Sequence, residues 1–145
     1  MKILIPLDGS ELALDAVHHA LRLLREGLRA SFVLASVQEP ANVSEMLLMP
    51  DAQLRENVNQ AVGAQALEAG AALLEAAGAT VEREVRSGYA ATMLIEIAED
   101  YGCDEIIIGA RGTGTLRSAL LGSVSQAILH ASTVPVTIVK HAAES

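Results

Sequence analysis

Four residues in the C-terminal part of the chain have the types and the spacing to bind a phosphate group through the main chain. They are Gly109, Gly112, Gly122 and Ser123, which form the pattern G-x2-G-x9-G-S. Glycine lets a ligand approach the backbone closely, because it has no side chain beyond a hydrogen. A helix that begins at Ser123 would add unpaired N–H groups and the positive end of its dipole. The pattern therefore predicts a phosphate site between a strand and a helix.

Neighbouring side chains could add to this predicted phosphate site. The predicted binding segment continues from Ser123 through Val124 to Ser125, and the two serine hydroxyls are further hydrogen-bond donors. Arg111 could add a positive charge, although an arginine on a loop is more often simply solvated. We therefore include Arg111, Val124 and Ser125 among the candidate binding residues.

A second group of candidate residues, Pro6, Leu7 and Asp8, ends the first apolar run of the chain. Ligands of parallel sheets bind beyond the carboxyl ends of the strands, and Asp8 would stand at such an end. A carboxylate near phosphates would repel them unless it faced a ribose or a divalent cation. Asp8 is therefore expected to contact the ligand away from its phosphates, and it allows Mg²⁺ without requiring it. The alternative is that Asp8 only closes a turn in the sequence DGS.

Other phosphate-binding and catalytic motifs are missing from the sequence. A Walker A loop needs Gly-Lys-Ser/Thr, but the lysines of the chain are Lys2 and Lys140. The dinucleotide pattern G-x-G-x-x-G fails, because Gly112-x-Gly114 is followed by Arg117. The sequence GSVSQ does not match the G-x-S-x-G nucleophile elbow, and the histidines lack metal-ligand spacing. These differences disfavour a P-loop enzyme, a nicotinamide enzyme, a serine hydrolase and a metal site.

Length, composition and charge narrow the class of protein. The 145 residues suit one domain over 1–145, and their 51% hydrophobic but only 2% aromatic content predicts a core of Ala, Leu, Val and Ile. The formal net charge of −8 disfavours nucleic acid and anionic membranes as partners. The single cysteine excludes an internal disulfide. No apolar run approaches about 20 residues, and ILIPL is too short for a signal peptide, which predicts a cytoplasmic protein.

Apolar runs and helical spacing predict alternating strands and helices. Strands are expected at 2–7, 31–37, 80–85, 105–109 and 134–140, and helices at 11–27, 51–77, 90–101 and from 123 onward. Ser10 is the expected N-cap of the first helix, and Gly78 is the expected C-cap of the second. This alternation predicts an α/β fold, a doubly wound five-stranded parallel sheet with helices on both faces. A ligand would then lie where the strand order reverses.

Two segments have a less regular pattern. Residues 38–50, QEPANVSEMLLMP, are expected to form a loop bounded by prolines. Their apolar part, EMLLMP, is expected to pack onto the core, and the alternatives are a lid over a ligand and a surface for a partner. Residues 80–85 alternate apolar and polar side chains, which is typical of a strand near the edge of a sheet.

The motifs resemble those of the universal stress protein family, specifically its ATP-binding branch. The likeness rests on ILIPLDGSELALDAV and on CDEIIIGARGTGTLRSALLGSVSQAILHASTVPVTIVK, and it is weak over 38–80. It implies a fold of the adenine-nucleotide α-hydrolase-like, Rossmann-like type and a homodimer paired through strand 134–140. By the same resemblance, Asp8 would contact the adenosine end of a nucleotide, and main chain near Val37 would hold the adenine. The glycine motif and Ser123 would hold the ribose and phosphates.

The resemblance implies a nucleotide-dependent stress-response sensor that binds ATP, ADP or AMP and signals to an unidentified protein partner. Asp8 is the candidate general base for hydrolysis, but its expected task is binding, so a binding module with at most slow ATP hydrolysis is favoured over an enzyme. One alternative is a nucleotide-independent dimer, which the glycine motif disfavours. The other is an adenylyl-transferring enzyme of related fold, whose Ser-Gly-Gly or His-containing motifs are missing. The sequence Ala35-Ser36 also departs from the larger residue and histidine that are common in the family.

Overall fold

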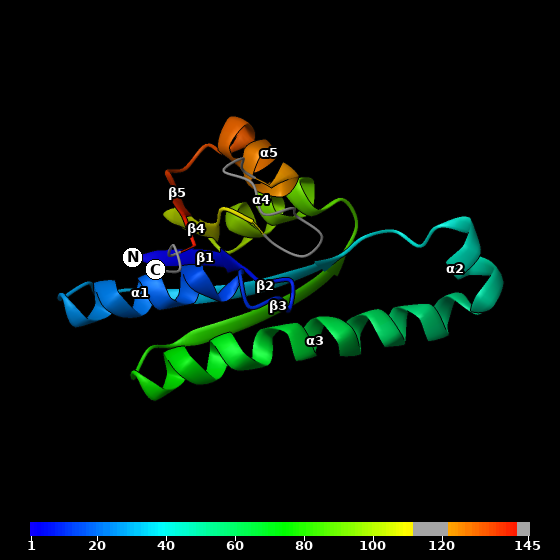
Figure 1. Ribbon diagram of the computed structural model, residues 1–145, viewed down its shortest axis with the longest axis horizontal. Coiled ribbons are helices and arrows are strands. Elements are labelled where there is room, and N and C mark those ends of the chain that lie inside the picture. The colour runs from blue at the N-terminus through cyan, green and yellow to red at the C-terminus, as the bar shows by residue number, and fades with distance from the viewer. Residues whose placement is uncertain (112–121, 142–145) are drawn as a thin grey trace.

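The protein forms a parallel sheet with helices packed on both of its faces (Figure 1). A computed structural model describes residues 1–111 and 122–141. Its strands lie in the order β3-β2-β1-β4-β5, and every neighbouring pair is parallel. They are β1 (Lys2–Pro6), β2 (Ser31–Gln38), β3 (Val81–Ser87), β4 (Glu105–Gly109) and β5 (Val136–Val139). The predicted doubly wound, five-stranded fold is confirmed.

The helices form two layers, one on each side of this sheet. In Figure 1, α1 and α3 lie below the strands, and α4 and α5 lie above them. The helices are α1 (Leu14–Arg25), α2 (Val43–Leu48), α3 (Ala52–Ala76), α4 (Ala90–Asp100) and α5 (Ser123–Ala131). No helix among the described residues is long and apolar enough to cross a membrane.

The inner strands are apolar on both faces, because each face is covered by helices. Ile3 and Ile5 of β1 pack with α1 and α3, whereas Leu4 between them packs with α4 and α5. In β2, Phe32 and Val33 divide between the same two cores. The two-residue period of a strand therefore converts one continuous apolar run into two helix-binding surfaces.

Glycine lets α3 lie close to the sheet. A Cβ atom on Gly70 would stand 2.6 Å from Leu7 Cδ1 and 3.3 Å from Val17 Cγ2. A Cβ atom on Gly63 would clash with the side chain of Val85. These two positions have no room for a side chain, so they set the distance between α3 and the sheet.

Two predicted helix starts had different outcomes. The side chain of Asp51 accepts hydrogen bonds from Gln53 N at 2.9 Å and Leu54 N at 3.2 Å, so the first residue of the predicted helix 51–77 is the N-cap of α3. The first helix begins later than predicted, at Leu14. Ser10 Oγ accepts a hydrogen bond from Ala13 N at 3.2 Å and so closes a separate turn before α1.

The expectation of a loop over 38–50 is wrong, because this segment contains α2. Asn42 caps the helix by accepting a hydrogen bond from Glu45 N at 2.8 Å, and its own amide donates to Glu45 Oε1 at 3.2 Å. No residue of α2 is buried, so EMLLMP does not pack onto the core as expected. The cap stabilises a short helix that the core does not require.

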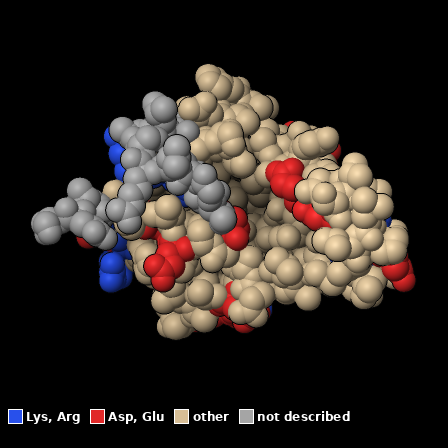
Figure 2. Space-filling view, turned by 45° about the vertical axis from the view of Figure 1, so that its right-hand side comes forward, with Lys and Arg blue, Asp and Glu red and all other residues tan. Residues whose placement is uncertain are grey.

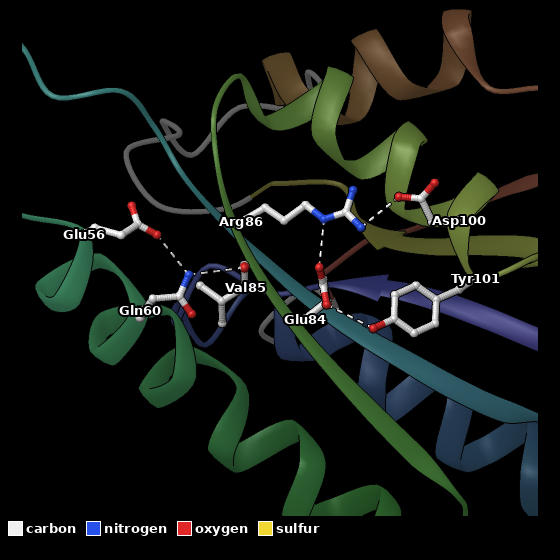
Figure 3. A network of polar contacts seen from close by, with 7 residues as sticks. All are labelled: Glu56, Gln60, Glu84, Val85, Arg86, Asp100 and Tyr101. Carbon is white, nitrogen blue, oxygen red and sulfur yellow. Dashed lines mark hydrogen bonds and ion pairs between the residues drawn. The ribbon is translucent and has the colours of Figure 1, made fainter. Parts of the chain in front are cut away.

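The exposed edge strand β3 carries charged side chains that are tied to a neighbouring helix (Figure 3). Arg86 donates to Glu84 Oε1 and Asp100 Oδ2, both at 2.8 Å, and Tyr101 Oη donates to Glu84 Oε2 at 2.9 Å. The two carboxylates raise the pKa of Arg86, and partial burial together with Glu84 raises the pKa of Tyr101. Charges along an edge strand oppose its pairing with another chain. The network therefore protects the edge and joins it to α4.

Candidate functional site

The candidate site lies at the carboxyl ends of the strands, where the order of the sheet reverses between β1 and β4. β1 pairs with β2 on one side and with β4 on the other, so the loops after β1 and β4 leave in opposite directions. A cavity of about 150 Å³ opens here, which we call the switch-point cavity. It is lined by Pro6, Leu7, Asp8, Ala35, Val37, Ala90, Leu94, Ile108, Gly109, Arg111 and Gly122 to Ser125. Figure 2 shows a hollow in this side of the molecule, with acidic side chains beside it.

One end of the switch-point cavity is polar, because the N-terminus of α5 faces it. Gly122 is the N-cap residue of α5 and, as a glycine, has no side chain with which to cap this end of the helix. Gly122 N donates to Ala110 O at 2.7 Å, which holds the start of α5 beside the end of β4. The first turn of α5 thus places main-chain N–H groups, including that of Ser123, at the cavity wall. This arrangement favours an anionic group at this end of the cavity.

Two of the predicted binding residues also have structural tasks. Ser125 is 4% exposed, and its hydroxyl donates to Gly109 O at 2.8 Å, so it joins α5 to β4. A Cβ atom on Gly109 would lie 3.1 Å from Leu12 O, in the turn that precedes α1. A larger residue at Gly109 would therefore press against this turn.

The turn after β1 holds Asp8 in place. Asp8 Oδ1 accepts hydrogen bonds from Ser10 N at 2.9 Å and Ser10 Oγ at 2.6 Å, which is the geometry of an Asx turn. Gly9 has a φ of 86°, a value that favours glycine. Asp8 is therefore both a turn residue and a lining residue of the cavity. The two interpretations of the sequence DGS do not exclude each other.

Another wall of the switch-point cavity is apolar. Ala35 and Val37 lie two residues apart in β2 and share one face of this strand, while Leu94 reaches the cavity from α4. Ala35 has no exposed surface, and its small side chain takes up little of the space at this wall. Apolar walls of this kind suit an aromatic ring.

The structure brings together every described residue that the sequence analysis selected. Their roles as ligand contacts stay predictions. Gly112, like Gly114 and Arg117, lies outside the described residues. The selected residues around the cavity are Pro6, Leu7, Asp8, Val37, Gly109, Arg111, Gly122, Ser123, Val124 and Ser125.

Sequence reasoning missed four lining residues, Ala35, Ala90, Leu94 and Ile108. Ala35 could have been found, because it precedes Val37 by two residues and so shares its face of the strand. Ala90 and Leu94 belong to α4, and no local signal showed that this helix borders the ends of β1 and β4. Within residues 1–111 and 122–141, no three His, Cys, Asp or Glu side chains gather as a metal site.

Both the sequence and the fold are similar to those of universal stress proteins. The model of the universal stress protein family matches residues 1–140. Universal stress protein MJ0531 of Methanocaldococcus jannaschii is 30% identical over 142 residues, which cover 96% of this chain and 81% of that protein. The solved structure of MJ0577, from the same organism, superposes with a TM-score of 0.81 at 28% identity, covering 99% of this chain and 97% of that one.

Two solved structures with the same fold carry adenine nucleotides. A universal stress protein in complex with cAMP has a TM-score of 0.70 at 24% identity, with 99% of this chain and 98% of that chain covered. A universal stress protein family protein from Arabidopsis thaliana with AMP bound has a TM-score of 0.73 at 19% identity, with coverages of 99% and 93%. At these identities the two structures show a shared fold.

Proposed function

Because the chain belongs to the universal stress protein family, we propose that it binds an adenine nucleotide in the switch-point cavity and acts as a nucleotide-dependent regulator of a stress response. The observation that carries this proposal is the pairing of two unlike walls in one cavity. Apolar side chains, among them Val37 and Leu94, face one part of it, and the N-terminus of α5 faces another. A purine ring with a phosphate tail has the same division into an apolar and an anionic part. The cAMP and AMP complexes of proteins with this fold support an adenine nucleotide over other phosphates.

In the proposed complex the base lies inside the cavity and the phosphates extend along the start of α5. The cavity of about 150 Å³ is smaller than the roughly 300 Å³ of a typical complete ligand pocket, so it suits the base better than a whole nucleotide. Gly122 and Ser123 would hold the phosphates through main-chain N–H groups, and Asp8 would contact the ribose. Ser125 would act by positioning α5, since its hydroxyl already donates to Gly109 O. Mg²⁺, if bound, would be held largely by the phosphates.

We propose binding and signalling, with hydrolysis slow at most. Asp8 is the one carboxylate among the described residues that line the cavity. Its Oδ1 already accepts two hydrogen bonds from Ser10, so this oxygen is poorly placed to take a proton from an attacking water. We place the protein in the cytoplasm, with a protein partner downstream.

Calorimetric titration with ATP, AMP, adenosine and inorganic triphosphate, each with and without Mg²⁺, tests the proposed site. ATP and AMP are expected to bind in the micromolar range, roughly −8 kcal/mol. Adenosine is expected to bind at least about tenfold more weakly, because each lost hydrogen bond to a charged group removes about 1.5–3 kcal/mol. No binding of any adenine compound would overturn the proposal and favour a nucleotide-independent dimer. If adenosine and AMP bound with equal affinity, the proposed contact between the phosphate and the N-terminus of α5 would be contradicted.

We further propose that two copies pair through β5 to form a homodimer, as the family resemblance implies. The carbonyl group of Pro135 accepts a hydrogen bond from Ile106 N of β4 at 3.0 Å, and that of Val139 accepts one from Ala110 N, just after β4, at 2.8 Å. The main-chain N–H and C=O groups of successive residues in a strand point to alternate sides, so the N–H groups of Val136 and Ile138 point away from β4. β5 has no neighbour on that side among the described strands, so this edge is open to a second β5.

An Ile138→Pro variant tests this pairing, because proline removes an outward N–H donor and is tolerated on an edge strand. Sedimentation equilibrium is expected to give twice the mass of one chain for the parent protein and the mass of one chain for the variant. Circular dichroism serves as the control for folding. A parent protein that is monomeric throughout, or a folded variant that stays dimeric, would contradict pairing through β5.

A further inference from the structure

The helical hairpin formed by α2 and the first part of α3 exposes an unusual amount of apolar surface. Among the described residues, ten large apolar side chains are exposed, and seven of them belong to this hairpin. We call these seven residues the hairpin surface. They are Val43 (73% exposed), Met46 (47%), Leu47 (77%), Leu48 (87%), Leu54 (48%), Val58 (39%) and Val62 (51%). Monomeric proteins rarely leave large apolar patches uncovered unless these serve as contact sites.

Helix caps and a hydrogen bond fix the backbone of the hairpin, although its residues before Gly63 are not buried in the core. Figure 1 shows α2 at one end of the molecule, beyond the strands. The first buried residue of α3 is Gly63, so about three turns of this helix precede its first buried residue. Arg55 Nη1 donates to Met49 O at 2.6 Å and closes the connection between the two helices. With caps at Asn42 and Asp51 as well, the hairpin presents its apolar side chains from a defined backbone.

A hollow of about 280 Å³ lies between α2 and α3 and could receive one large side chain of a partner. Leu48, Met49 and Val58 supply apolar walls. Glu39 and Glu45 supply two carboxylates at the same hollow, and Arg55, which donates to Met49 O, supplies one positive charge, so the lining is net negative. The place therefore suits a long side chain that is apolar along its stem and positive at its end.

The charge of this region favours a cationic occupant. Over residues 39–62 the sequence has four acidic residues (Glu39, Glu45, Asp51 and Glu56) and one basic residue, Arg55, so the net charge is 1 − 4 = −3. This segment thus holds a large share of the total charge of −8. A second copy of the chain or an anionic membrane would be repelled here, whereas a basic partner would be attracted.

The hairpin surface could supply much of one side of a protein interface. The seven side chains together offer roughly 250–500 Å² of apolar area, if a fully exposed Val, Leu or Met side chain counts as about 60–120 Å². A standard interface buries about 800 Å² on each partner, of which about 57%, or roughly 450 Å², is apolar. The hairpin surface alone would supply about half or more of this apolar share.

We propose that the hairpin surface docks a cationic amphipathic helix of a partner protein. Such a helix would place apolar side chains at positions i, i+3, i+4 and i+7 against α2 and α3. Lysine or arginine side chains beside this stripe would meet Glu39 and Glu45. The site is separate from the nucleotide proposal, since it shares no lining residue with the switch-point cavity.

The test uses a fluorescein-labelled 14-residue peptide made of leucine and lysine, with leucine at the i, i+3, i+4 and i+7 positions. Fluorescence anisotropy with the full chain is expected to give micromolar binding that weakens at least about tenfold in a Leu48→Asp variant. Leu48 is 87% exposed, so this variant is expected to fold. Leu129→Asp is the matched control, because Leu129 is an exposed leucine on α5 and is expected to keep the parent affinity.

Charge variants separate specific docking from general attraction to an acidic protein. Glu45→Lys is expected to weaken peptide binding several-fold, whereas Glu96→Lys, on α4, makes the same change in net charge and is expected to leave it nearly unchanged. Absence of peptide binding, or equal loss in each variant and its control, would overturn the proposal. It would also be overturned if Leu48→Asp lowered the oligomeric mass in sedimentation equilibrium, because the hairpin surface would then be an interface between copies of this chain.

Discussion

A Gly122→Val variant is expected to bind ATP at least about 100-fold more weakly than the parent protein, a loss of about 2.7 kcal/mol. The variant would place a branched side chain at the N-cap of α5, where the proposed phosphate contacts lie. Hydrogen bonds from main-chain N–H groups to a phosphate contribute about 1.5–3 kcal/mol each, and they need close approach. Blocking two of them would account for the expected loss. Calorimetric titration with ATP measures it directly.

The fold should survive this change, which makes the variant informative. Gly122 has φ −64° and ψ 158°, an extended conformation that valine adopts without strain. Its N–H bond to Ala110 O would be kept. Valine is a poorer N-cap than glycine, so a melting temperature lower by about 2–4 °C is expected. Ala127→Val, an exposed position on the same helix, is the control and should bind ATP normally. If Gly122→Val keeps the parent affinity, the phosphates lie elsewhere.

A Gly70→Val variant is expected to lower the free energy of unfolding by about 3 kcal/mol and the melting temperature by about 10 °C. The added Cβ atom alone would stand 2.6 Å from Leu7 Cδ1, and both Leu7 and Val17 are buried in the core. Helix propensity would change in the favourable direction, because glycine is the poorer helix former. The expected loss is therefore entirely steric. Urea denaturation followed by circular dichroism would measure it.

Ala72→Val provides the matched comparison for this steric effect. Ala72 lies on the exposed side of the same helix, so valine there should cost only about 0.5 kcal/mol of helix propensity. A Gly70→Val protein as stable as Ala72→Val would mean that α3 can move away from the sheet at little cost. Leu7 also lines the switch-point cavity, so such movement would reach the proposed nucleotide site.

The sheet and most of its helices could be predicted because burial leaves a strong pattern in the sequence. Strands covered on both faces read as apolar runs, and Asp51 marked the start of α3 with a side chain that caps it. The short helix α2 was missed, because it buries nothing and so has no apolar period that points to a core. Its signal was the pair Asn42 and Glu45, which cap each other. The start of α1 was placed too early, since Ser10 can cap a turn as readily as a helix.

The part of the candidate site that lies at the carboxyl ends of the strands could be predicted from the sequence. Asp8, Val37 and Gly109 follow or end neighbouring strands, and parallel strands bring their carboxyl ends to one edge. The contribution of α4 depends on where the chain crosses the sheet, which local sequence does not encode. The bond from Ser125 to Gly109 O also depends on three-dimensional packing, because a hydroxyl donates to whichever acceptor lies near. The single-domain interpretation of 1–145, the ligand roles and the homodimer stay predictions.

The central position of β1 has a consequence for synthesis on the ribosome. This strand is translated before β2 and β4, yet it becomes the middle of the sheet, with Ile3 paired to Phe32 on one side and to Glu105 on the other. Until residues 105–109 have been translated, the β4 side of β1 has unpaired N–H and C=O groups beside apolar side chains. Such an edge is a template for pairing with another chain. A truncated product that ends before Glu105 would therefore keep an unpaired edge on β1, which β4 covers in the folded chain.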